Sequence, residues 1–207
     1  ATGLPDPEHL MTVRELTILA RHIILDFPEY YKIYSEREFT WNKILQKNRN
    51  PLLVEYPGAD GMKTGYTKEA GYGLVGSAVR DGRRLLIGIA GLTTLNDRKQ
   101  EAQKLLDWGF SQFTTIGVYA AGDTVSKARV WGGAENWVDL VTKQDVNLAL
   151  SPKERDEIQV KLNYTGPLMA PVKPGQQVGT MRFLVDGKTI AEVPVETASA
   201  VAAVDSM

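Results

Sequence analysis

The sequence predicts an α+β domain, in which helices pack on an antiparallel sheet, followed by a small all-β domain. Three patterns support this fold class. Residues 12–27 have the cap and the apolar period of an amphipathic helix, and residues 60–90 contain three successive strand-like segments. Short strand-like segments separated by turns then fill residues 118–195. We place the domain boundary so that the domains are residues 1–112 and 113–207, the second ending in a loose tail.

The first helix is expected to begin after Thr12, because Thr12 and Glu15 have the spacing of a capping box. Apolar residues then recur with the helical period and predict one buried face, and Pro28 ends the run. The residues of this face are Leu16, Leu19, Ala20, Ile23, Ile24 and Phe27. Residues 29–34 predict a short second helix, and residues 35–57 predict irregular strands and loops.

The next region predicts an antiparallel meander. Its first strand covers residues 60–67, and its second, over residues 69–78, is rich in small side chains. Asp81-Gly82 is a two-residue turn of the type that requires positive φ angles. Residues 84–90 then form the return strand. Three neighbouring strands in chain order therefore make up the sheet of the first domain.

A helix over residues 97–108 follows the meander, and we expect it to stop at Gly109. Its first turn carries Arg98 and Lys99, although the positive end of a helix dipole favours anions there. Two explanations stay open at this point. Asp97 offsets the two cations, or Arg98 and the helix start together attract an anion.

The second domain shows no catalytic constellation. Strict alternation over residues 159–164 and the Asp186-Gly187 turn predict antiparallel strands. Three acidic residues, Glu154, Asp156 and Glu157, fall in what reads as a polar, solvated loop. Trp131 and Trp137 flank a pair of glycines; stacking on carbohydrate is an alternative there, but we expect both rings to pack in the core.

Composition excludes several classes of function. A chain of 207 residues that is 43% hydrophobic is long enough for two small cores. The formal charge of −1 gives no basis for a nucleic-acid partner, and the absence of cysteine removes disulfides and thiol chemistry. Neither His9 nor His22 has ligand-like spacing, so we predict no metal and no cofactor. No apolar run approaches the roughly 20 residues of a membrane span, and residues 1–3 do not begin a signal peptide.

Residues 60–67 are the most informative segment of the chain. In an extended strand Lys63 and Gly65 point to one face, and Thr64 points to the other unless the strand twists. A glycine within a strand marks a place where a ligand or another backbone comes close. A cation beside a bare strand edge suits a peptide whose C-terminal carboxylate must be held. Taken alone, however, the Lys-Thr-Gly tripeptide favours an ordinary solvated lysine on a strand edge.

The neighbouring segments reverse that preference, because together they resemble a known family. The sequence resembles the serine-type D-alanyl-D-alanine carboxypeptidases, which are the low-molecular-mass penicillin-binding proteins. The resemblance runs from the first residue to about Thr197. The matching segments, in family order and at family spacing, are Phe39-Thr40-Trp41-Asn42, Asn48-Arg49-Asn50, Asp60-Gly61-Met62-Lys63-Thr64-Gly65, Ala70-Gly71-Tyr72 and Lys104-Leu105-Leu106-Asp107-Trp108-Gly109-Phe110.

The resemblance implies the fold and the activity of the full-length protein. The first domain would be the C-terminal half of a penicillin-binding and β-lactamase-like transpeptidase domain. Enzymes of this family remove the terminal D-alanine from peptidoglycan stem peptides through an acyl-enzyme, and they bind β-lactam antibiotics. The implied roles are peptidoglycan biosynthesis and control of cell shape. The implied location is periplasmic or extracytoplasmic, at the outer face of the cytoplasmic membrane.

The resemblance also implies the site residues. Lys63 would place its ammonium beside the carboxylate of the substrate, and Thr64 would hydrogen-bond the same group. Gly65 would let the substrate backbone approach and pair with the strand edge. The backbone N–H of Tyr66 would be the second donor of the oxyanion hole. The catalytic residues are then Lys63, Thr64, Gly65 and Tyr66, and the substrate-binding residues are Lys63, Thr64, Arg49 and Arg98.

The sequence departs from the family at the nucleophile. Family members carry a Ser-x-x-Lys motif and a Ser-x-Asn motif before Lys-Thr-Gly. No serine of this chain is followed by Lys three places on or by Asn two places on. We therefore interpret the chain as the C-terminal portion, which alone should not acylate and whose partner is the missing N-terminal portion. The alternative is a non-catalytic binding or spacer module of the cell envelope. A β-lactamase is disfavoured, because such enzymes usually lack a β-domain after the final helix.

Overall fold

The computed structural model describes residue 6 and residues 8–204. The chain divides into two compact units between Ser111 and Gln112, next to the predicted domain boundary. None of the helices in the described part of the chain is both long enough and apolar enough to cross a bilayer.

The first unit contains the predicted meander. Its three-stranded antiparallel sheet has the order β3 (Ala59–Thr67), β4 (Gly71–Arg80) and β5 (Arg83–Leu92). Asp81 and Gly82 both have positive φ, of 50° and 74°, between β4 and β5, as the sequence predicts for this turn. The strand that carries Lys63 is therefore an edge strand.

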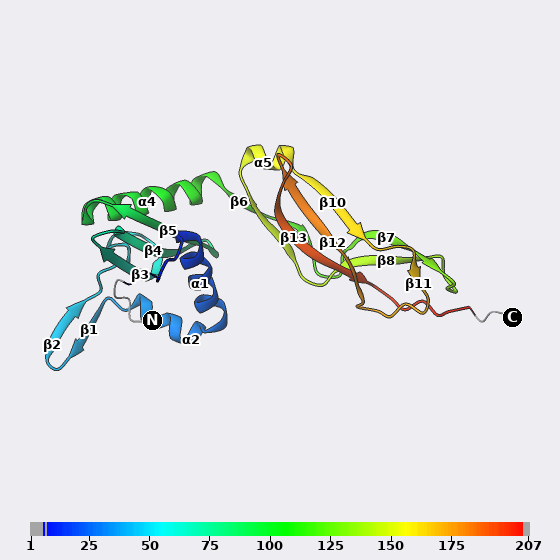
Figure 1. Ribbon diagram of the computed structural model, residues 1–207, viewed down its shortest axis with the longest axis horizontal. Helices are drawn as coiled ribbons and strands as arrows, with labels where there is room; N and C mark the ends of the chain where they lie inside the picture. Colours follow the sequence, from blue (N-terminus) through cyan, green and yellow to red (C-terminus); the bar gives the residue numbers. More distant parts are fainter. Residues whose placement is uncertain (1–5, 7, 205–207) are drawn as a thin grey trace. The chain divides into compact units, whose positions relative to one another are not determined.

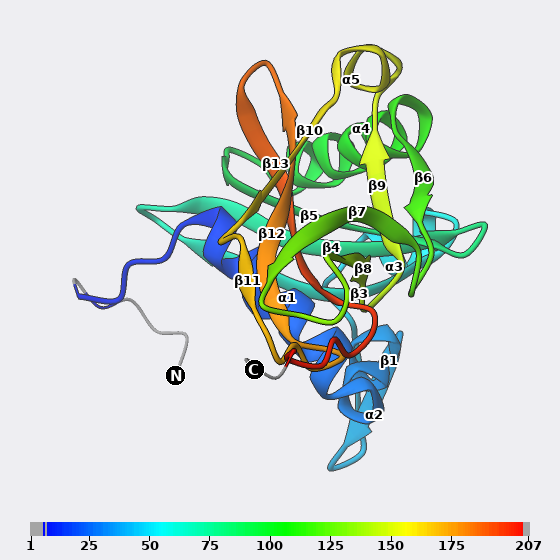
Figure 2. The same cartoon turned by 90° about the vertical axis from the view of Figure 1, so that its right-hand side faces the viewer.

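Helices cover opposite faces of this sheet (Figures 1 and 2). Helix α4 (Leu95–Gln112) packs on one face, and helix α1 (Val13–Asp26) packs on the other. The alternation of β4 serves both layers, since Leu74 faces α4 and Val75 faces α1. The cluster on the α4 side comprises Leu52, Tyr56, Leu74, Ala78, Ile87, Ala102 and Leu106, and the cluster on the α1 side comprises Ala20, Tyr31 and Met62.

The capping box of α1 is confirmed. The backbone N–H of Glu15 donates to Thr12 Oγ1 at 3.2 Å, and the N–H of Thr12 donates to Glu15 Oε2 at 2.7 Å. The predicted buried face is wrong in part, because Leu19 is 50% exposed and Phe27 is 52% exposed. The cause is that the sheet contacts a narrow strip of the helix, on which Ala20 is buried.

Short elements connect α1 to the sheet. Helix α2 (Pro28–Tyr31) and a 3₁₀ helix (Lys32–Ser35) together correspond to the predicted short helix. A two-stranded hairpin of β1 (Glu38–Trp41) and β2 (Ile44–Lys47) follows, and then the short helix α3 (Leu52–Glu55).

The predicted end of α4 is wrong, since the helix continues through Gly109 to Gln112. A Cβ built on Gly109 would lie 2.8 Å from Leu85 Cδ1 of β5. The glycine therefore lies where the helix packs closely on the Leu85 side chain, and it does not act as a C-terminal cap. Sequence alone does not separate these two uses of glycine near a helix end.

The second unit is built mainly from strands. Its six-stranded sheet has the order β10-β12-β13-β8-β7-β11, and β6 pairs with β9 in a separate two-stranded sheet. The elements are β6 (Thr114–Tyr119), β7 (Thr124–Trp131), β8 (Trp137–Thr142), β9 (Val146–Leu150), α5 (Pro152–Glu157), β10 (Gln159–Tyr164), β11 (Leu168–Met169), β12 (Gln177–Val185) and β13 (Lys188–Thr197). The predicted polar loop with three acidic residues is instead the exposed helix α5, which begins with a capping box of Ser151 and Glu154.

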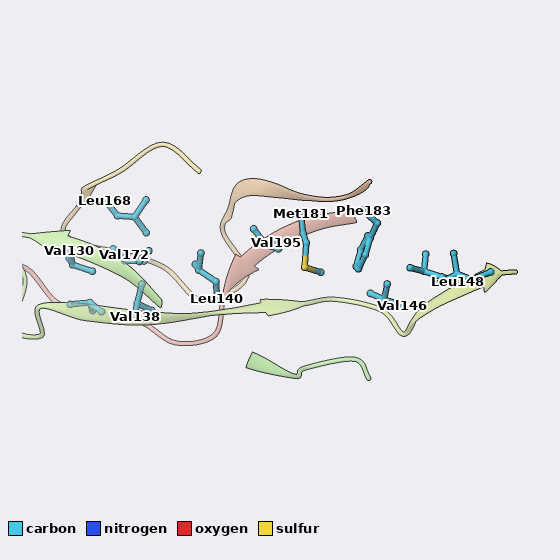
Figure 3. Close-up of a cluster of buried hydrophobic side chains, with 13 residues drawn as sticks. Val130, Val138, Leu140, Val146, Leu148, Leu168, Val172, Met181, Phe183 and Val195 are labelled. Carbon is cyan, nitrogen blue, oxygen red and sulfur yellow. The ribbon is translucent and has the colours of Figure 1, made fainter. Parts of the chain in front are cut away.

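The core of the second unit lies between its two sheets (Figure 3). Phe183 and Met181 of β12 and Leu140 of β8 are among its most deeply buried side chains. Asp186 and Gly187 have positive φ angles of 49° and 72° between β12 and β13, so the predicted turn is confirmed.

The prediction that Trp131 and Trp137 pack in the core is wrong, because they are 64% and 54% exposed. The pleat explains the difference. Val130 and Val138 point into the core cluster, and each is next in sequence to one of the tryptophans (Figure 3). Adjacent side chains of a strand point to opposite faces, so both indoles lie on the outer face of the sheet.

We predict that Gly88→Ala destabilises the first unit by about 1–3 kcal/mol. A Cβ at Gly88 would lie 2.5 Å from Val13 Cγ1 and 3.2 Å from the backbone carbonyl oxygen of Val13, so α1 would have to move off the sheet. The shift of the urea unfolding midpoint measures the effect. Gly65→Ala is the matched control, because a Cβ there meets no atom within 4 Å. Equal shifts in the two variants would contradict this account of the packing.

Candidate active site

The Lys-Thr-Gly segment lies in the middle of β3, at the open edge of the sheet. Among the described residues, β3 pairs only with β4, so the backbone groups on its other side have no strand partner. Lys63 and Gly65 are exposed and Thr64 is buried, which matches the predicted alternation. An edge strand of this kind presents N–H and C=O groups to which an extended peptide could add.

The ammonium of Lys63 bonds to its own strand. Its Nζ donates to the backbone carbonyl oxygen of Thr64 at 2.7 Å. Within residues 8–204, no carboxylate forms an ion pair with Lys63. The positive charge beside the open edge therefore has no counter-ion in the described structure. An anion that arrives along β3 would meet a cation that is already in position.

The edge is open at Gly65 and bordered by an aromatic pair just after it. A Cβ built on Gly65 would meet no atom within 4 Å, so the packing of the chain itself does not require a glycine here. The exposed ring of Tyr66 lies against Tyr72 of β4, with 4.4 Å between the ring centroids and 35° between the planes. The glycine thus leaves room for an incoming backbone, and the two rings mark the end of that space.

Arg98 is the second cation near this end of the sheet. It is only 5% exposed, and its guanidinium carbon lies 5.6 Å from the centroid of the Tyr72 ring. Nη2 donates to the backbone carbonyl of Arg49 at 3.4 Å, whereas Nε is buried without a hydrogen-bond partner. Burial lowers the pKa of Arg98, and Tyr72 opposes this effect. A buried guanidinium with an unpaired donor is costly, and an anionic ligand would reduce that cost.

The start of α4 shows features of both explanations left open by the sequence. Thr93 Oγ1 donates to Asp97 Oδ2 at 2.7 Å, and this hydrogen bond holds the pKa of Asp97 below its usual range. Asp97 therefore supplies the first-turn anion that the helix dipole favours. Arg98, one residue later, turns inward toward Tyr72 and the Arg49 backbone. Neutralisation of the dipole and an inward-facing cation thus coexist in one turn.

Tyr72 links two of the predicted site residues, because its ring contacts Tyr66 of β3 and Arg98 of α4. Arg49 takes part through its backbone, and its side chain is exposed. The adjacent Asn50 is buried; its Oδ1 accepts the N–H of Leu52 at 3.1 Å, and its Nδ2 has no partner. The roles assigned to these residues toward a substrate stay predictions.

Asp60 forms an ion pair that the sequence analysis missed. Asp60 Oδ2 lies 2.7 Å from Arg84 Nη2, and Arg84 Nη1 donates to Asp60 Oδ1 at 2.9 Å. The hydroxyl of Tyr31 also donates to Asp60 Oδ1, at 2.8 Å. Arg84 stands in β5 and Tyr31 in α2, so no local sequence pattern links these residues to Asp60 at the start of β3.

The electrostatics of this network follow from its burial and its hydrogen bonds. Burial alone would raise the pKa of Asp60, but hydrogen bonds from Arg84 and Tyr31 outweigh it and hold that pKa below its ordinary value. Burial raises the pKa of Tyr31 to about 12, and the neighbouring Asp60 adds to the effect. The network therefore keeps a charged carboxylate and a neutral phenol at the start of the motif strand.

A hollow of about 340 Å³ lies away from Lys63, between the 3₁₀ helix and the β1–β2 hairpin. Its lining residues are Ile33, Glu36, Glu38, Phe39, Gln46, Lys47 and Asn48. None of the catalytic residues implied by the sequence takes part in it. The chemistry of Lys63 and Arg98 is a better guide to the site than the size of this hollow, because both are cations without a counter-ion.

The comparison with known proteins decides the family. Residues 1–93 match the family model described as D-alanyl-D-alanine carboxypeptidase, and residues 113–203 match the model described as penicillin-binding protein 5, C-terminal domain. The chain belongs to the low-molecular-mass penicillin-binding proteins. The resemblance stated from the sequence is thereby confirmed.

Individual members of this penicillin-binding protein family give the same result. The chain is 40% identical over 197 residues to the D-alanyl-D-alanine carboxypeptidase DacA of Haemophilus influenzae, which covers 94% of this chain and 50% of the relative. It also superposes on penicillin-binding protein 5 of Haemophilus influenzae with a TM-score of 0.81 and 39% identity, over 96% of this chain and 59% of the other. The chain thus spans about half the length of the curated relatives it matches. The predicted fold class is confirmed.

A second similar structure is penicillin-binding protein D2 of Listeria monocytogenes in its cefotaxime-bound form. It has a TM-score of 0.50 and 32% identity, and the match covers 54% of this chain and 46% of the other.

We predict that Asp60→Asn destabilises the first unit by about 1–3 kcal/mol, because it leaves the partly buried Arg84 guanidinium without a charged partner. Urea unfolding followed by circular dichroism measures this loss. Glu101→Gln is the control, since the Lys104–Glu101 pair is solvent-exposed on α4 and should contribute less than about 1 kcal/mol. An equal loss of unfolding free energy in the two variants would contradict a stabilising role for the Asp60–Arg84 ion pair.

The same network predicts how stability depends on pH. The pKa of Asp60 is lowered by folding, so its contribution is present above the unfolded value of about 4 and is lost as the pH falls through the lower folded value. The pKa of Tyr31 is raised to about 12, so its contribution is lost as the pH rises above the unfolded value of about 10. Urea midpoints measured across pH should fall at both ends, and Asp60→Asn should flatten the acidic end.

Proposed function

We propose that this chain is part of a serine-type D-alanyl-D-alanine carboxypeptidase, which removes the terminal D-alanine from peptidoglycan stem peptides through an acyl-enzyme. The observation that carries the proposal is the Lys63-Thr64-Gly65 segment at the open edge of β3, within a region that matches the carboxypeptidase family model. The curated relatives in Haemophilus influenzae and Escherichia coli bear the name of this activity.

Each site residue has a role that its position supports. A stem peptide adds to the open side of β3, and its backbone passes Gly65, where nothing obstructs it. The terminal carboxylate lies near Lys63, whose ammonium has N–H donors besides the one that bonds to the Thr64 carbonyl. Arg98 adds positive potential from the start of α4. Negative charge that develops in the transition state is stabilised by the same cation and by the N–H of Tyr66.

The nucleophile comes from a segment outside these 207 residues, because the sequence holds neither Ser-x-x-Lys nor Ser-x-Asn. Helix α1 offers a surface on which such a segment would pack. Its side away from the sheet carries exposed apolar side chains, and an exposed apolar patch of this kind marks an interaction surface. These residues are Ile18, Leu19 and Leu25. The missing portion would then supply the serine and the second wall of the cleft.

The same site would bind β-lactam antibiotics, which present a carboxylate and a strained amide to the serine. Support comes from the similar penicillin-binding protein D2 of Listeria monocytogenes, whose structure was solved in a cefotaxime-bound form. The substrate fixes the location that we propose, which is the periplasmic or extracytoplasmic side of the membrane. The second candidate, a non-catalytic binding or spacer module, is favoured only by the absence of the two serine motifs from this sequence.

The test uses labelled penicillin. The chain alone should not be labelled, and the chain joined to a nucleophile-bearing N-terminal portion of a family member should be. In the joined protein we expect Lys63→Ala to lower the acylation rate by about 10²–10³-fold, because it removes the cation that faces the developing charge. Gly65→Ala should also slow acylation, although its added Cβ meets no atom of the chain.

Lys104→Ala is the control, because Lys104 is exposed on α4 and pairs with Glu101. It should leave the rate unchanged. Absence of labelling in the folded, joined protein would favour the non-catalytic module. Labelling that proceeds at an equal rate in Lys63→Ala and Lys104→Ala would remove Lys63 from the site.

A further inference from the structure

The outer face of β7 and β8 carries two exposed indoles. Trp131 ends β7 and Trp137 begins β8, and both rings lie on the face away from the core. The register pairs Arg129 with Trp137, which places Trp131 diagonally across from Trp137. Diagonal neighbours of this kind stand about 7–8 Å apart at their Cα atoms. The two indoles therefore form one platform on neighbouring strands.

This platform is not needed by the fold. Val130 and Val138 already fill the core from the same strands, and Figure 3 shows both among the buried side chains. The other outward positions of β7 are ordinary polar residues, Lys127 and Arg129. Met169 of β11 aligns with Trp131 and extends the exposed apolar surface to a third strand. Large apolar side chains held in water at such positions mark a binding surface.

Charged groups surround the two rings, and one of them is unpaired. Lys127 pairs with Asp139 at 3.5 Å on the same face. Arg129 lies opposite Trp137 and two residues before Trp131, and its side chain forms no hydrogen bond or ion pair with any residue that the structure describes. Glu135 and Asn136 are exposed in the loop that joins the strands. The platform thus combines two flat apolar faces, polar groups at its rim and one uncompensated cation.

We propose that this face of the second unit binds a polysaccharide strand of amino sugars that carries carboxylate groups, as a peptidoglycan glycan strand does where its stem peptides have been removed. One face of a pyranose ring consists largely of C–H groups and stacks on an indole, while the hydroxyl and amide groups at the ring edge bond to polar side chains. Two indoles on adjacent strands hold two sugars of one strand. Arg129 pairs with a carboxylate carried by a sugar between them.

The surroundings favour this occupant over a lipid surface or a peptide. Charged side chains surround the indoles, among them Glu135 and the Lys127–Asp139 pair, and such groups are costly to bring into a bilayer. An extended peptide would add to a strand edge, whereas the indoles lie on the face of the sheet, with β7 paired on both sides by β8 and β11. A sugar strand needs an aromatic face and polar groups beside it, and both are present here.

The test measures binding by this chain without any acylation, so its result is independent of the proposed carboxypeptidase activity. The probe is glycan strands freed of their peptides, which expose lactyl carboxylates, and a chitin oligosaccharide serves as the uncharged comparison. Isothermal titration calorimetry should show saturable binding that is tighter for the charged strands. Trp131→Ala and Trp137→Ala should each weaken it by about tenfold or more. Arg129→Gln should remove the preference for the charged strands.

Trp41→Ala is the matched control, because Trp41 is equally exposed but lies in the first unit, and it should leave binding unchanged. Urea midpoints of all variants should match the parent chain, because the substituted side chains are solvent-exposed. Absence of binding to both glycans would overturn the proposal. Binding to phosphatidylglycerol vesicles that depends on Trp131 and Trp137, without glycan binding, would overturn it in favour of a membrane surface.

Discussion

The position of β3, the strand that carries Lys63-Thr64-Gly65, depends on the ion pair between Asp60 and Arg84. It joins the start of β3 to β5, across β4, and Tyr31 of α2 donates a hydrogen bond to the same carboxylate. Three elements from different parts of the chain therefore meet at one carboxylate, three residues before Lys63. Because β3 is an edge strand with a neighbour on one side only, such a tie fixes its start where pairing alone would allow fraying.

The two helices that pack on the sheet, α4 and α1, differ in how much of their apolar surface is exposed to solvent. Helix α4 is matched to its face by Gly109, which lets it approach Leu85, and its cluster is well buried. Helix α1 is close to the sheet at Gly88 but leaves much of its apolar surface exposed. Within the described residues, the α4 layer of the first unit is thus well buried, whereas the α1 layer leaves apolar side chains exposed to solvent.

Local patterns in the sequence predicted the local structure well. The capping box at Thr12 and the positive φ at Asp81-Gly82 each depend on residues a few positions apart, so both could be found without the fold. The partner of Asp60 could not, because Arg84 and Tyr31 are distant in sequence. The prediction that Trp131 and Trp137 are buried was wrong for a related reason. Alternation defines the two faces of a strand, but only the packing of whole sheets shows which face is buried. The role of Gly109 likewise depended on its neighbour in β5.

The hydrogen bond from the Lys63 ammonium to the Thr64 carbonyl has a consequence for selectivity. An ammonium has three N–H donors and the Thr64 carbonyl accepts from one of them, so a ligand oxygen would meet a cation that the strand already holds in position. A formal negative charge makes a shorter and stronger bond with an ammonium than an uncharged oxygen does. If the terminal carboxylate of a peptide binds at Lys63, as we propose, the ammonium would favour it over capped or amidated chain ends, whose oxygens carry no formal charge.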